Sequence, residues 1–363
     1  MKESKNRPAE IARKLDLVRR HAEGRAVRLR GIDWFAWITA GGSSAVLLAA
    51  ETGVAEVVVT DSDAWVVTDT IEAGRLQQEE LPDGISIHAC RWAYPREREA
   101  FIRDIARGAA VASDRPQAGE DALSEALVRQ KRLMSPGEAS CYREVGALAT
   151  QAMTEVLVRA APEWTELQLA GAGAEALLCR GLDPALVMAA GERRLRLYRH
   201  PMPKDEPLGS LAMLVFCARG HGLYANLTRF VSFGPLSSAD AELHRHVREV
   251  ESAALAASRP GTSLGKIYRT LADAYAAHGF AGAIGEHHQG GTTGYLSREI
   301  VATPDTCETL GYGSAVAWNP SITGAKVEDT FLVTDTGLEN VTLDQEWPTV
   351  PVLGINRPLV LER

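Results

Sequence analysis

Hydrophobic residues recur along this chain at two spacings, and the alternation between them predicts its secondary structure. Residues 8–24 predict a helix, because apolar positions recur there at roughly helical spacing, at Ile11, Leu15, Leu17 and Val18. Four short runs rich in β-branched residues predict strands: AVRLRG, AVLLAA, AEVVVTDSDAWVVTD and ISIHACRW, with a helical IEAGRLQQEEL between the last two. This alternation is typical of a small α/β domain over about residues 1–115.

A polar stretch with two prolines then predicts a domain junction. It reads VASDRPQAGEDALSEALVRQKRLMSPGEASC, and we place a linker at residues 116–134. Ser135 suits an N-cap and Pro136 suits the first helical position, so a long helix should begin there and run to about Arg159. A second helix should run from Trp164-Thr165-Glu166 to about Cys179.

Paired strands are predicted further along, in MLVFCARGHGLYANLTRFVSFG and in AVAWNPSITGAKVEDTFLVT, with a helix over residues 239–257 between them. Residues 135–363 should therefore form a second domain. The expected fold class is α/β (α+β) with two domains.

The net charge and the cysteine content limit the classes of partner and the cellular compartment that we expect for this chain. The formal net charge is -8 and no Lys/Arg block stands out, which argues against a general binder of nucleic acid or anionic membranes. Five scattered cysteines without a CxxC pattern suit a reducing cytoplasm. The polar N-terminus lacks the apolar region of a signal peptide, and no apolar run is long enough to span a bilayer. We expect a cytoplasmic protein with a small-molecule substrate.

The order of these elements resembles the creatinase/aminopeptidase P/methionine aminopeptidase superfamily, the pita-bread fold of peptidase family M24. In the first domain the resemblance rests on LDLVRRH, IDWFAWITAGG and IEAGRLQQEEL. In the second it rests on MSPGEASCYREVGALA, WTELQLAGAGAEALLCRG, GLYANLTRF and KVEDTFLVTDTGLENVT. It implies a creatinase-like N-terminal domain at 1–115 and a pita-bread catalytic domain at 135–363.

The metallopeptidases of this superfamily hold two divalent ions with two Asp, one His and two Glu, which together activate a water and polarise the scissile carbonyl. Matching the motifs puts Val215, Asn226, Gly291, Asn319 and Glu328 at the five ligand positions. Glu328 alone keeps the family's ligand, and Val215 and Gly291 offer no side-chain ligand to a hard cation. We therefore expect no metal at this place and no cofactor.

Within the superfamily, creatinase and the ectoine hydrolases also lack the metal set and use a histidine to transfer protons. By resemblance, His200 in LYRHPMPKDE and His287 in EHHQGGTTGY match pocket histidines, and neutral imidazole suits proton transfer near pH 7. A lone histidine is also often a core or surface residue, and that alternative stays open. Adjacent residues on a strand point to opposite faces, so either His287 or His288 should enter the pocket, not both.

Glu299 and Glu328 are the candidate acids beside these histidines. Two nearby carboxylates would raise one pKa and suit acid/base catalysis, or each would pair with a cation such as Arg298, Lys326 or Arg229. Arg298 replaces a family histidine, and its guanidinium would fork onto a substrate carboxylate. The candidates for substrate binding are Tyr224, Asn226, Arg229, His288, Tyr295, Arg298, Asn319 and Lys326.

Two further features of the second domain allow more than one interpretation. Cys217 shares a strand face with Val215 and is either a nucleophile or, more commonly for a cysteine between Phe and Ala, a small buried residue. The GGTTG run lacks the phosphate-loop pattern, and we expect its glycines to let the backbone pass close to a ligand.

These residues favour a metal-independent hydrolase or lyase acting on a C–N or related bond of a small amino-acid-derived substrate. One alternative is an Xaa-Pro aminopeptidase or dipeptidase-like metallopeptidase with a degenerate metal site. Another is a non-catalytic binding protein, as among the superfamily's histone-chaperone relatives. The resemblance also implies a homodimer that pairs through the N-terminal domain, with Trp34 and Trp37 at the contact.

Overall fold

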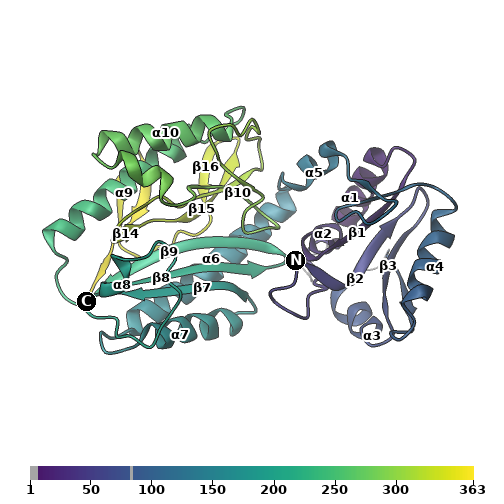
Figure 1. Ribbon diagram of the computed structural model, residues 1–363, viewed down its shortest axis with the longest axis horizontal. Helices are drawn as coiled ribbons and strands as arrows, with labels where there is room; N and C mark the ends of the chain where they lie inside the picture. Colours follow the sequence, from purple (N-terminus) through teal and green to yellow (C-terminus); the bar gives the residue numbers. More distant parts are fainter. Residues whose placement is uncertain (1–6, 82–84) are drawn as a thin grey trace. The chain divides into compact units, whose positions relative to one another are not determined.

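The computed structural model describes residues 7–81 and 85–363, which divide into two compact units (Figure 1). Unit 1 extends to Arg132 and includes Pro136–Cys141, and unit 2 comprises Leu133–Ser135 and Tyr142–Arg363. Each unit combines helices with β-sheet, which confirms the predicted two-domain α/β class. Within the described ranges, no helix has both the length and the apolar character that a membrane crossing requires.

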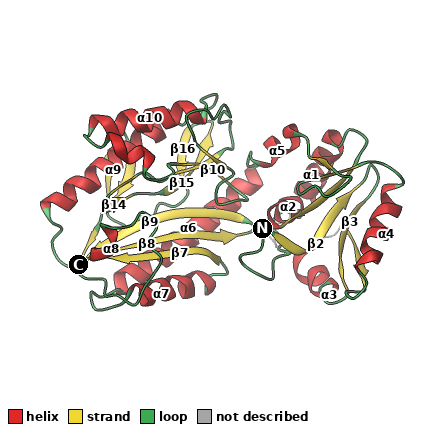
Figure 2. Cartoon of the chain, viewed as in Figure 1, coloured by secondary structure: helices red, strands yellow, loops and turns green. Residues whose placement is uncertain are grey.

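Unit 1 is built on one six-stranded sheet with the order β4-β3-β2-β1-β5-β6. Figure 2 labels its strands β1, β2 and β3. Its strands are β1 (Ala26–Gly31), β2 (Thr52–Val59), β3 (Ala64–Asp69), β4 (Ser86–Cys90), β5 (Val111–Ser113) and β6 (Asp121–Ala122). Its helices are α1 (Arg7–His21), α2 (Ile32–Ile38), α3 (Ala73–Arg75), the π-helical η1 (Leu76–Glu80), α4 (Pro95–Ala106) and α5 (Glu125–Lys131). Ile102 of α4 packs on the sheet against Val58 and Val67. The range 116–134, expected as a linker, contains β6 and α5.

The structure differs from two sequence predictions in unit 1. The AVLLAA run at residues 45–50 is not a strand but a loop between α2 and β2, in which the side chains of Val46, Leu47 and Leu48 are exposed. Composition suggested a strand there, yet the run has no strand partner to satisfy its backbone. Trp34 and Trp37 are 5% and 1% exposed, so their side chains are packed inside unit 1 and offer little surface to a second chain.

Unit 2 contains two sheets and two hairpins. The four-stranded sheet has the order β19-β9-β8-β7 and the five-stranded sheet has the order β11-β10-β12-β15-β16. The first is formed by β7 (Asp183–Gly191), β8 (Leu211–Gly220), β9 (Leu223–Ser232) and β19 (Leu361–Glu362). The second is formed by β10 (Gly290–Thr293), β11 (Ile300–Val301), β12 (Ala315–Trp318), β15 (Asp329–Thr334) and β16 (Gly337–Asn340). The hairpins are β13 (Ser321–Ile322) with β14 (Ala325–Lys326), and β17 (Thr349–Val352) with β18 (Ile355–Pro358).

Helices cover the outer faces of these sheets, as Figure 1 shows for α7 and α10. The helices are α6 (Pro136–Arg159), α7 (Glu166–Leu178), α8 (Glu192–Leu195), α9 (Ser238–Ala257), α10 (Leu264–Ala277) and the 3-10 helix η2 (Ala281–Gly285). Thr165 caps α7 through a capping box with Gln168, as the Trp164-Thr165-Glu166 start suggested. One core lies between α6, α7 and the four-stranded sheet, and a second lies between α9, α10 and the five-stranded sheet. The predicted helices and paired strands of this domain are confirmed.

Candidate functional site

The two sheets of unit 2 meet where β9 approaches the start of β15. Thr228 and Glu328 form an isolated β-bridge there, and Thr228 N donates to Glu328 O at 3.0 Å. Thr228 Oγ1 also donates to the Glu328 carboxylate at 3.2 Å. The candidate residues that follow lie on the strands and loops around this junction.

Three histidines converge near it from two distant segments. His200 comes from the loop after α8, and His287 and His288 come from the segment between η2 and β10. The Nε2 atoms of His200 and His287 lie 2.7 Å apart, and the ring centroids of His287 and His288 lie 4.5 Å apart in a stacked arrangement. The ring centroids of His200 and His288 are 5.6 Å apart. The expectation that just one of His287 and His288 enters the pocket is therefore wrong, because this segment is not a strand and its two rings can stack on the same side.

Contacts outside the imidazoles hold the two segments together. Arg199, next to His200, forms an ion pair with Glu286, next to His287. Gln289 Nε2 donates to the backbone oxygen of His287 at 2.6 Å, and its Oε1 accepts from Tyr275 Oη at 3.0 Å. Sequence analysis did not single out these supporting residues, because none of them has a signal without knowledge of the fold.

Glu328 is buried between two cations. Its Oε1 lies 2.5 Å from an Arg298 guanidinium nitrogen, and its Oε2 lies 3.8 Å from Lys326 Nζ. Burial alone would raise the pKa of Glu328, but Arg298 and Lys326 outweigh burial and lower it. The carboxylate therefore stays ionised at neutral pH, and of the two alternatives for Glu328 the geometry shows the ion pair.

These charges and burial also set the state of the imidazoles. Burial, followed by Lys326, lowers the pKa of His200, although Glu328 opposes this. Burial, followed by Lys326, lowers the pKa of His287 to about 2, and burial, followed by Arg298, lowers the pKa of His288 to about 4. All three imidazoles are thus neutral near pH 7 and able to accept a proton. Two cations and one carboxylate leave the surroundings with a net positive charge, which favours an anionic group on a ligand.

Lys326 is the cation best placed to receive such a group. Its side chain is buried, and burial lowers its pKa. Nζ lies 3.8 Å from Glu328 Oε2, beyond hydrogen-bond distance, so its N–H donors can turn towards an oxygen of a ligand.

The residues at the five family ligand positions do not fit a dinuclear metal centre. Val215 and Gly291 bring no ligand atom, and Gly291 has φ 153° with a neighbour, Ile300 O, only 2.0 Å from where a Cβ would stand. Asn226 Nδ2 donates to Thr293 Oγ1 at 3.0 Å, which leaves its amide oxygen facing inward. Within the described ranges, Asn226 Oδ1 and Asn319 Oδ1 are buried without a hydrogen-bond partner. Two neutral amides and one carboxylate that is already paired with Arg298 provide too little negative charge for two divalent ions.

The three imidazoles are a second group to test for metal binding. One nitrogen from each lies within 4.8 Å of the others, a spacing at which they could hold one transition-metal ion. The cations Arg298 and Lys326 act on the same rings, and their charge disfavours a divalent ion there.

The structure places other predicted residues away from such a role. Arg229 is 3% exposed and donates to Asp329 Oδ1 at 2.7 Å and to Thr342 O at 2.9 Å, so its prediction as a substrate-binding residue is wrong. Its neighbours on β9, Asn226 and Thr228, face the junction, and the strand period of two sends Arg229 to the opposite side.

Glu299 supports a turn in the structure. Its Oε1 accepts from the backbone N–H of Tyr295 at 3.0 Å and of Leu296 at 3.2 Å. The Tyr295 side chain is 1% exposed, and Tyr224 Oη accepts from Arg219 at 3.4 Å at the end of the β8–β9 hairpin. These polar groups have protein partners, whereas the amide oxygens of Asn226 and Asn319 are buried without one.

Cys217 and the glycine run have structural explanations. Cys217 is opposite Asn226 in the β8–β9 pairing, and burial, followed by Glu328, raises the pKa of its thiol to about 12. The thiol is therefore protonated and a poor nucleophile. Gly290 and Gly291 lie in β10 between β11 and β12, and a Cβ at Gly290 would stand 2.1 Å from Ala317 O. The glycines admit a close approach of neighbouring strands rather than of a ligand, which corrects the expectation.

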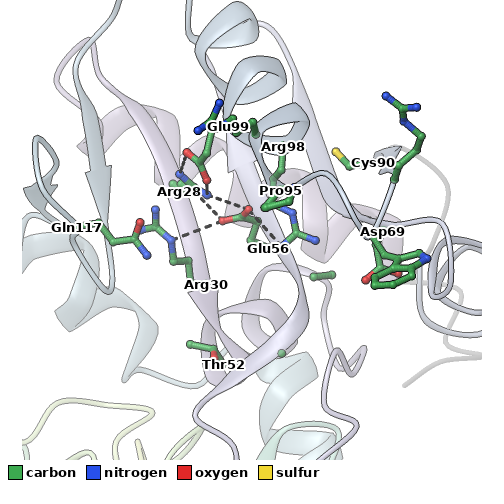
Figure 3. Close-up of a pocket in the computed structure, with 15 residues that line it drawn as sticks. Arg28, Arg30, Thr52, Glu56, Asp69, Cys90, Pro95, Arg98, Glu99 and Gln117 are labelled. Atoms are coloured by element: carbon green, nitrogen blue, oxygen red, sulfur yellow. Dashed lines mark hydrogen bonds and ion pairs between the residues drawn. The ribbon is translucent and has the colours of Figure 1, made fainter.

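Unit 1 has a hollow of its own, of about 600 Å³ (Figure 3). Figure 3 shows Arg28 between Glu56 and Glu99, with which it forms ion pairs of 2.6 and 2.7 Å. Arg30, beside it, pairs with Glu120 at 2.6 Å. Because the guanidinium groups of Arg28 and Arg30 already have carboxylate partners inside unit 1, we assign this hollow no ligand.

The chain is similar to known proteins over its whole length. A model for metallopeptidase family M24 matches residues 140–335. The dipeptidase PepE from Mycobacterium ulcerans is 19% identical with a TM-score of 0.76, over 98% of this chain and 99% of that one. The Xaa-Pro dipeptidase from Bacillus anthracis is 16% identical with a TM-score of 0.75, over 97% of this chain and 100% of that one.

A domain from a subunit of a protein complex shares the fold as well. The N-terminal domain of FACT complex subunit SPT16 from Cicer arietinum (chickpea) is 12% identical with a TM-score of 0.68, over 93% of this chain and 95% of that one. No curated protein sequence matches the chain significantly. Likeness at these identities shows the fold, which is the pita-bread fold that the sequence motifs predicted.

Proposed function

Because the chain belongs to metallopeptidase family M24, a family of hydrolases, we propose that it is a metal-independent hydrolase or lyase. Its substrate is a small amino-acid-derived molecule in which a C–N or related bond is cleaved. The observation that carries the proposal is the pair of neutral imidazoles, His200 and His287, with Nε2 atoms 2.7 Å apart beside the Glu328–Arg298 ion pair. Proton transfer by imidazole replaces the metal-activated water of the peptidases.

In hydrolysis, His200 accepts a proton from the attacking water and returns it to the leaving nitrogen. The water oxygen forms the new bond to carbon as the C–N bond breaks, so the imidazole ends the cycle unchanged. His287 holds His200 through the Nε2 contact. In elimination, the same imidazole would take a proton from the carbon next to the one that bears the leaving nitrogen. A C=C bond would form as the C–N bond breaks, and the imidazolium would return the proton to the departing nitrogen.

The charges around the histidines select the substrate. A carboxylate of the substrate binds the Lys326 ammonium, and the remaining N–H donors of Arg298 support it. The inward-facing oxygens of Asn226 and Asn319 accept hydrogen bonds from the substrate's nitrogen groups. Glu328 keeps Arg298 in place and is not itself the proton donor.

The experiment is a cleavage screen with protein that has been treated with EDTA and dialysed. The panel contains N-acyl and amidino amino acids, related small zwitterions and Xaa-Pro dipeptides, and products are followed by mass spectrometry. We expect turnover of a member of the first groups without added metal, and its loss in His200→Ala. His21→Ala, which removes an imidazole from unit 1, is the matched control and should keep full activity.

Three outcomes distinguish the alternatives. Metal-stimulated cleavage of an Xaa-Pro dipeptide by the unmodified chain would contradict the proposal and favour a degenerate metallopeptidase. Binding of a panel member without turnover would favour a non-catalytic binding protein. Turnover that persists in His200→Ala would contradict the proposed role of His200 but not the proposed substrate class.

We also propose that the protein acts as a homodimer in the cytoplasm. The support for a dimer is the exposed apolar loop of unit 1, in which the Val46, Leu47 and Leu48 side chains are 57%, 71% and 46% exposed. Light scattering should give twice the chain mass, and Leu47→Asp should shift it towards the monomer. A monomer across micromolar concentrations would contradict this.

A further inference from the structure

A second cluster of metal-ligating side chains lies on the outer helices of unit 2, and none of its members belongs to the candidate site. His246 and Glu249 are one turn apart on α9, and His278 is the C-cap of α10. The Nδ1 atoms of His246 and His278 lie 3.0 Å apart. Glu249 Oε2 lies 3.9 Å from His246 Nδ1 and 3.3 Å from His278 Nε2.

The outward nitrogens of both imidazoles face carboxylates. His246 Nε2 lies 3.2 Å from Glu242 Oε1, one turn earlier on α9, and His278 Nε2 faces Glu249. A carboxylate favours the tautomer with the proton on the nitrogen that faces it. Arg245 Nη2 also lies 3.5 Å from His246 Nε2, but Glu242 is nearer. With the protons on the outward nitrogens, both Nδ1 lone pairs point at one another across 3.0 Å, an arrangement that a cation between them would stabilise.

The spacing suits a transition-metal ion. Zinc binds imidazole nitrogen at about 2.0–2.1 Å in tetrahedral sites, which places two such nitrogens about 3.3 Å apart. The two Nδ1 atoms need to separate by only a few tenths of an ångström to reach that spacing. Ligand atoms of all three residues, which are partly buried, lie within 4.8 Å of one another, and a water would complete a tetrahedral set.

The charge balance distinguishes this cluster from the three histidines of the candidate site. Arg245 pairs with both Glu242 and Glu249, at 2.7 and 2.8 Å, and Arg248 also acts on Glu249, so two cations face two carboxylates and the charges balance. At the candidate site, Arg298 and Lys326 face one carboxylate and the net charge is positive. A divalent ion meets less electrostatic opposition in the first arrangement than in the second.

We propose that His246, His278 and Glu249 form a zinc-class metal site that ties α9 to the C-terminal end of α10. Glu242 is its positioning residue, because it orients the His246 ring without binding the ion. An ion that binds only the folded chain stabilises it by mass action. Zinc binding at this site should therefore stabilise the second core of unit 2.

The test uses the full chain without an affinity tag, stripped with EDTA and titrated with Zn²⁺ by calorimetry, with Co²⁺ absorption to report tetrahedral ligands. We expect one Zn²⁺ per chain in the wild type and a Tm that rises with Zn²⁺ and not with Mg²⁺. His246→Gln and His278→Gln should each abolish binding, and Glu242→Gln should weaken it by about 10-fold to 100-fold. Far-UV circular dichroism shows whether each variant is folded, and Glu249→Gln provides a further ligand variant.

His200→Ala is the control for the candidate site, and it should bind Zn²⁺ as the wild type does. Absence of Zn²⁺ binding in the wild type, or binding unchanged in folded His246→Gln, would overturn the proposed site and leave the proposed function intact. Binding that is lost in His200→Ala but kept in His246→Gln would place the ion at the candidate site. That result would contradict both the proposed zinc site and the metal-independent mechanism.

Discussion

His200 Nε2 faces His287 Nε2 at 2.7 Å, so one ring donates and the other accepts the proton between them. Burial and the nearby Lys326 lower the pKa of both rings, which keeps the pair neutral. A neutral pair can take up one proton from a substrate or water and share it across the short contact. In the proposed mechanism, this histidine pair is the proton acceptor in place of a metal-activated water.

The first prediction separates proton transfer from binding. His200→Ala should lower kcat by about 10²-fold or more, because it removes the general base, with substrate affinity largely kept. Lys326→Met should instead raise KM by about 10-fold or more, because it removes an ammonium that binds the substrate's carboxylate in the ground state. Steady-state kinetics on the substrate found in the screen measure both values. Equal effects of the two variants on kcat and KM would argue against separate roles.

The second prediction concerns the pH dependence of the rate. Because the pKa of His200 is lowered, its basic form persists below the ordinary value of 6.5, and kcat/KM should fall only at a more acidic pH. After burial, Lys326 is the next cause, so Lys326→Met should move the acidic limb towards higher pH. A pH series of kcat/KM for both proteins tests this. An acidic limb in the wild type above pH 6.5 would contradict the assignment.

The sequence predicted the helices and strands around this site better than the contacts between its side chains. The strand motifs place β8, β9 and β15, and the period of two puts Cys217 and Val215 on one face of β8. That same period sends Arg229 away from the junction, so local pattern alone could have excluded it. The meeting of His200 with His287 depends on two loops joined by Arg199 and Glu286, and no local pattern encodes it.

The third prediction is that Gly291 cannot be replaced without loss of stability. Its φ of 153° is unfavourable for other residues, and a Cβ would stand 2.0 Å from Ile300 O. Gly291→Ala should therefore lower the free energy of unfolding by at least about 1–3 kcal/mol. Gly282→Ala is the matched control, because a Cβ there meets nothing within 4 Å and should cost little. Urea unfolding of both variants measures the difference, and equal stabilities would contradict the clash.

The same geometry bears on the lost metal centre. The family's histidine ligand would have to stand at Gly291, where β10 runs between β11 and β12. Restoring acidic residues through Val215→Asp, Asn226→Asp and Asn319→Glu should consequently not restore metal-dependent peptidase activity. Metal-stimulated Xaa-Pro cleavage by that triple variant would show that the backbone of β10 adapts.

The fourth prediction is that stability falls with acid below pH 6.5 in part through His244. Burial, and next Arg248, lower the pKa of this imidazole to about 3, and the ring packs on Phe230 with centroids 4.5 Å apart. Its folded pKa is below the unfolded value, so its contribution is present above pH 6.5 and is lost as pH falls towards 3. Through this group, the free energy of unfolding should fall by about 1.4 kcal/mol for each pH unit in that window. His244→Phe should make the acid dependence of the unfolding free energy shallower by about this slope, and an unchanged dependence would contradict it.

The last prediction concerns the buried ion network beneath the start of β15. Arg357 is fully buried and donates to Glu251 Oε2 at 2.7 Å and to Asp329 Oδ2 at 2.8 Å, while Arg229 pairs with Asp329 Oδ1 at 2.7 Å. Burial raises the pKa of Glu251 to about 8, although Arg357 opposes this shift. Arg357→Met removes that cation and leaves Glu251 and Asp329 facing one guanidinium in the core. The loss should be about 3–5 kcal/mol of unfolding free energy, because an uncompensated buried charge costs more than the pair contributed.

Adding Glu251→Gln to Arg357→Met restores the charge balance, since Asp329 keeps Arg229, and it should recover part of that loss. Arg143→Met is the control for losing an arginine at an exposed pair, with Glu339, and should change stability by no more than about 1 kcal/mol. Asp329 directly follows Glu328, so the single variant should also loosen the carboxylate that holds Arg298 and raise KM. Denaturant unfolding and kinetics on the same samples test both effects. If the Arg357→Met protein is as stable as the Arg143→Met protein, water or a neutralised Glu251 compensates for the missing cation.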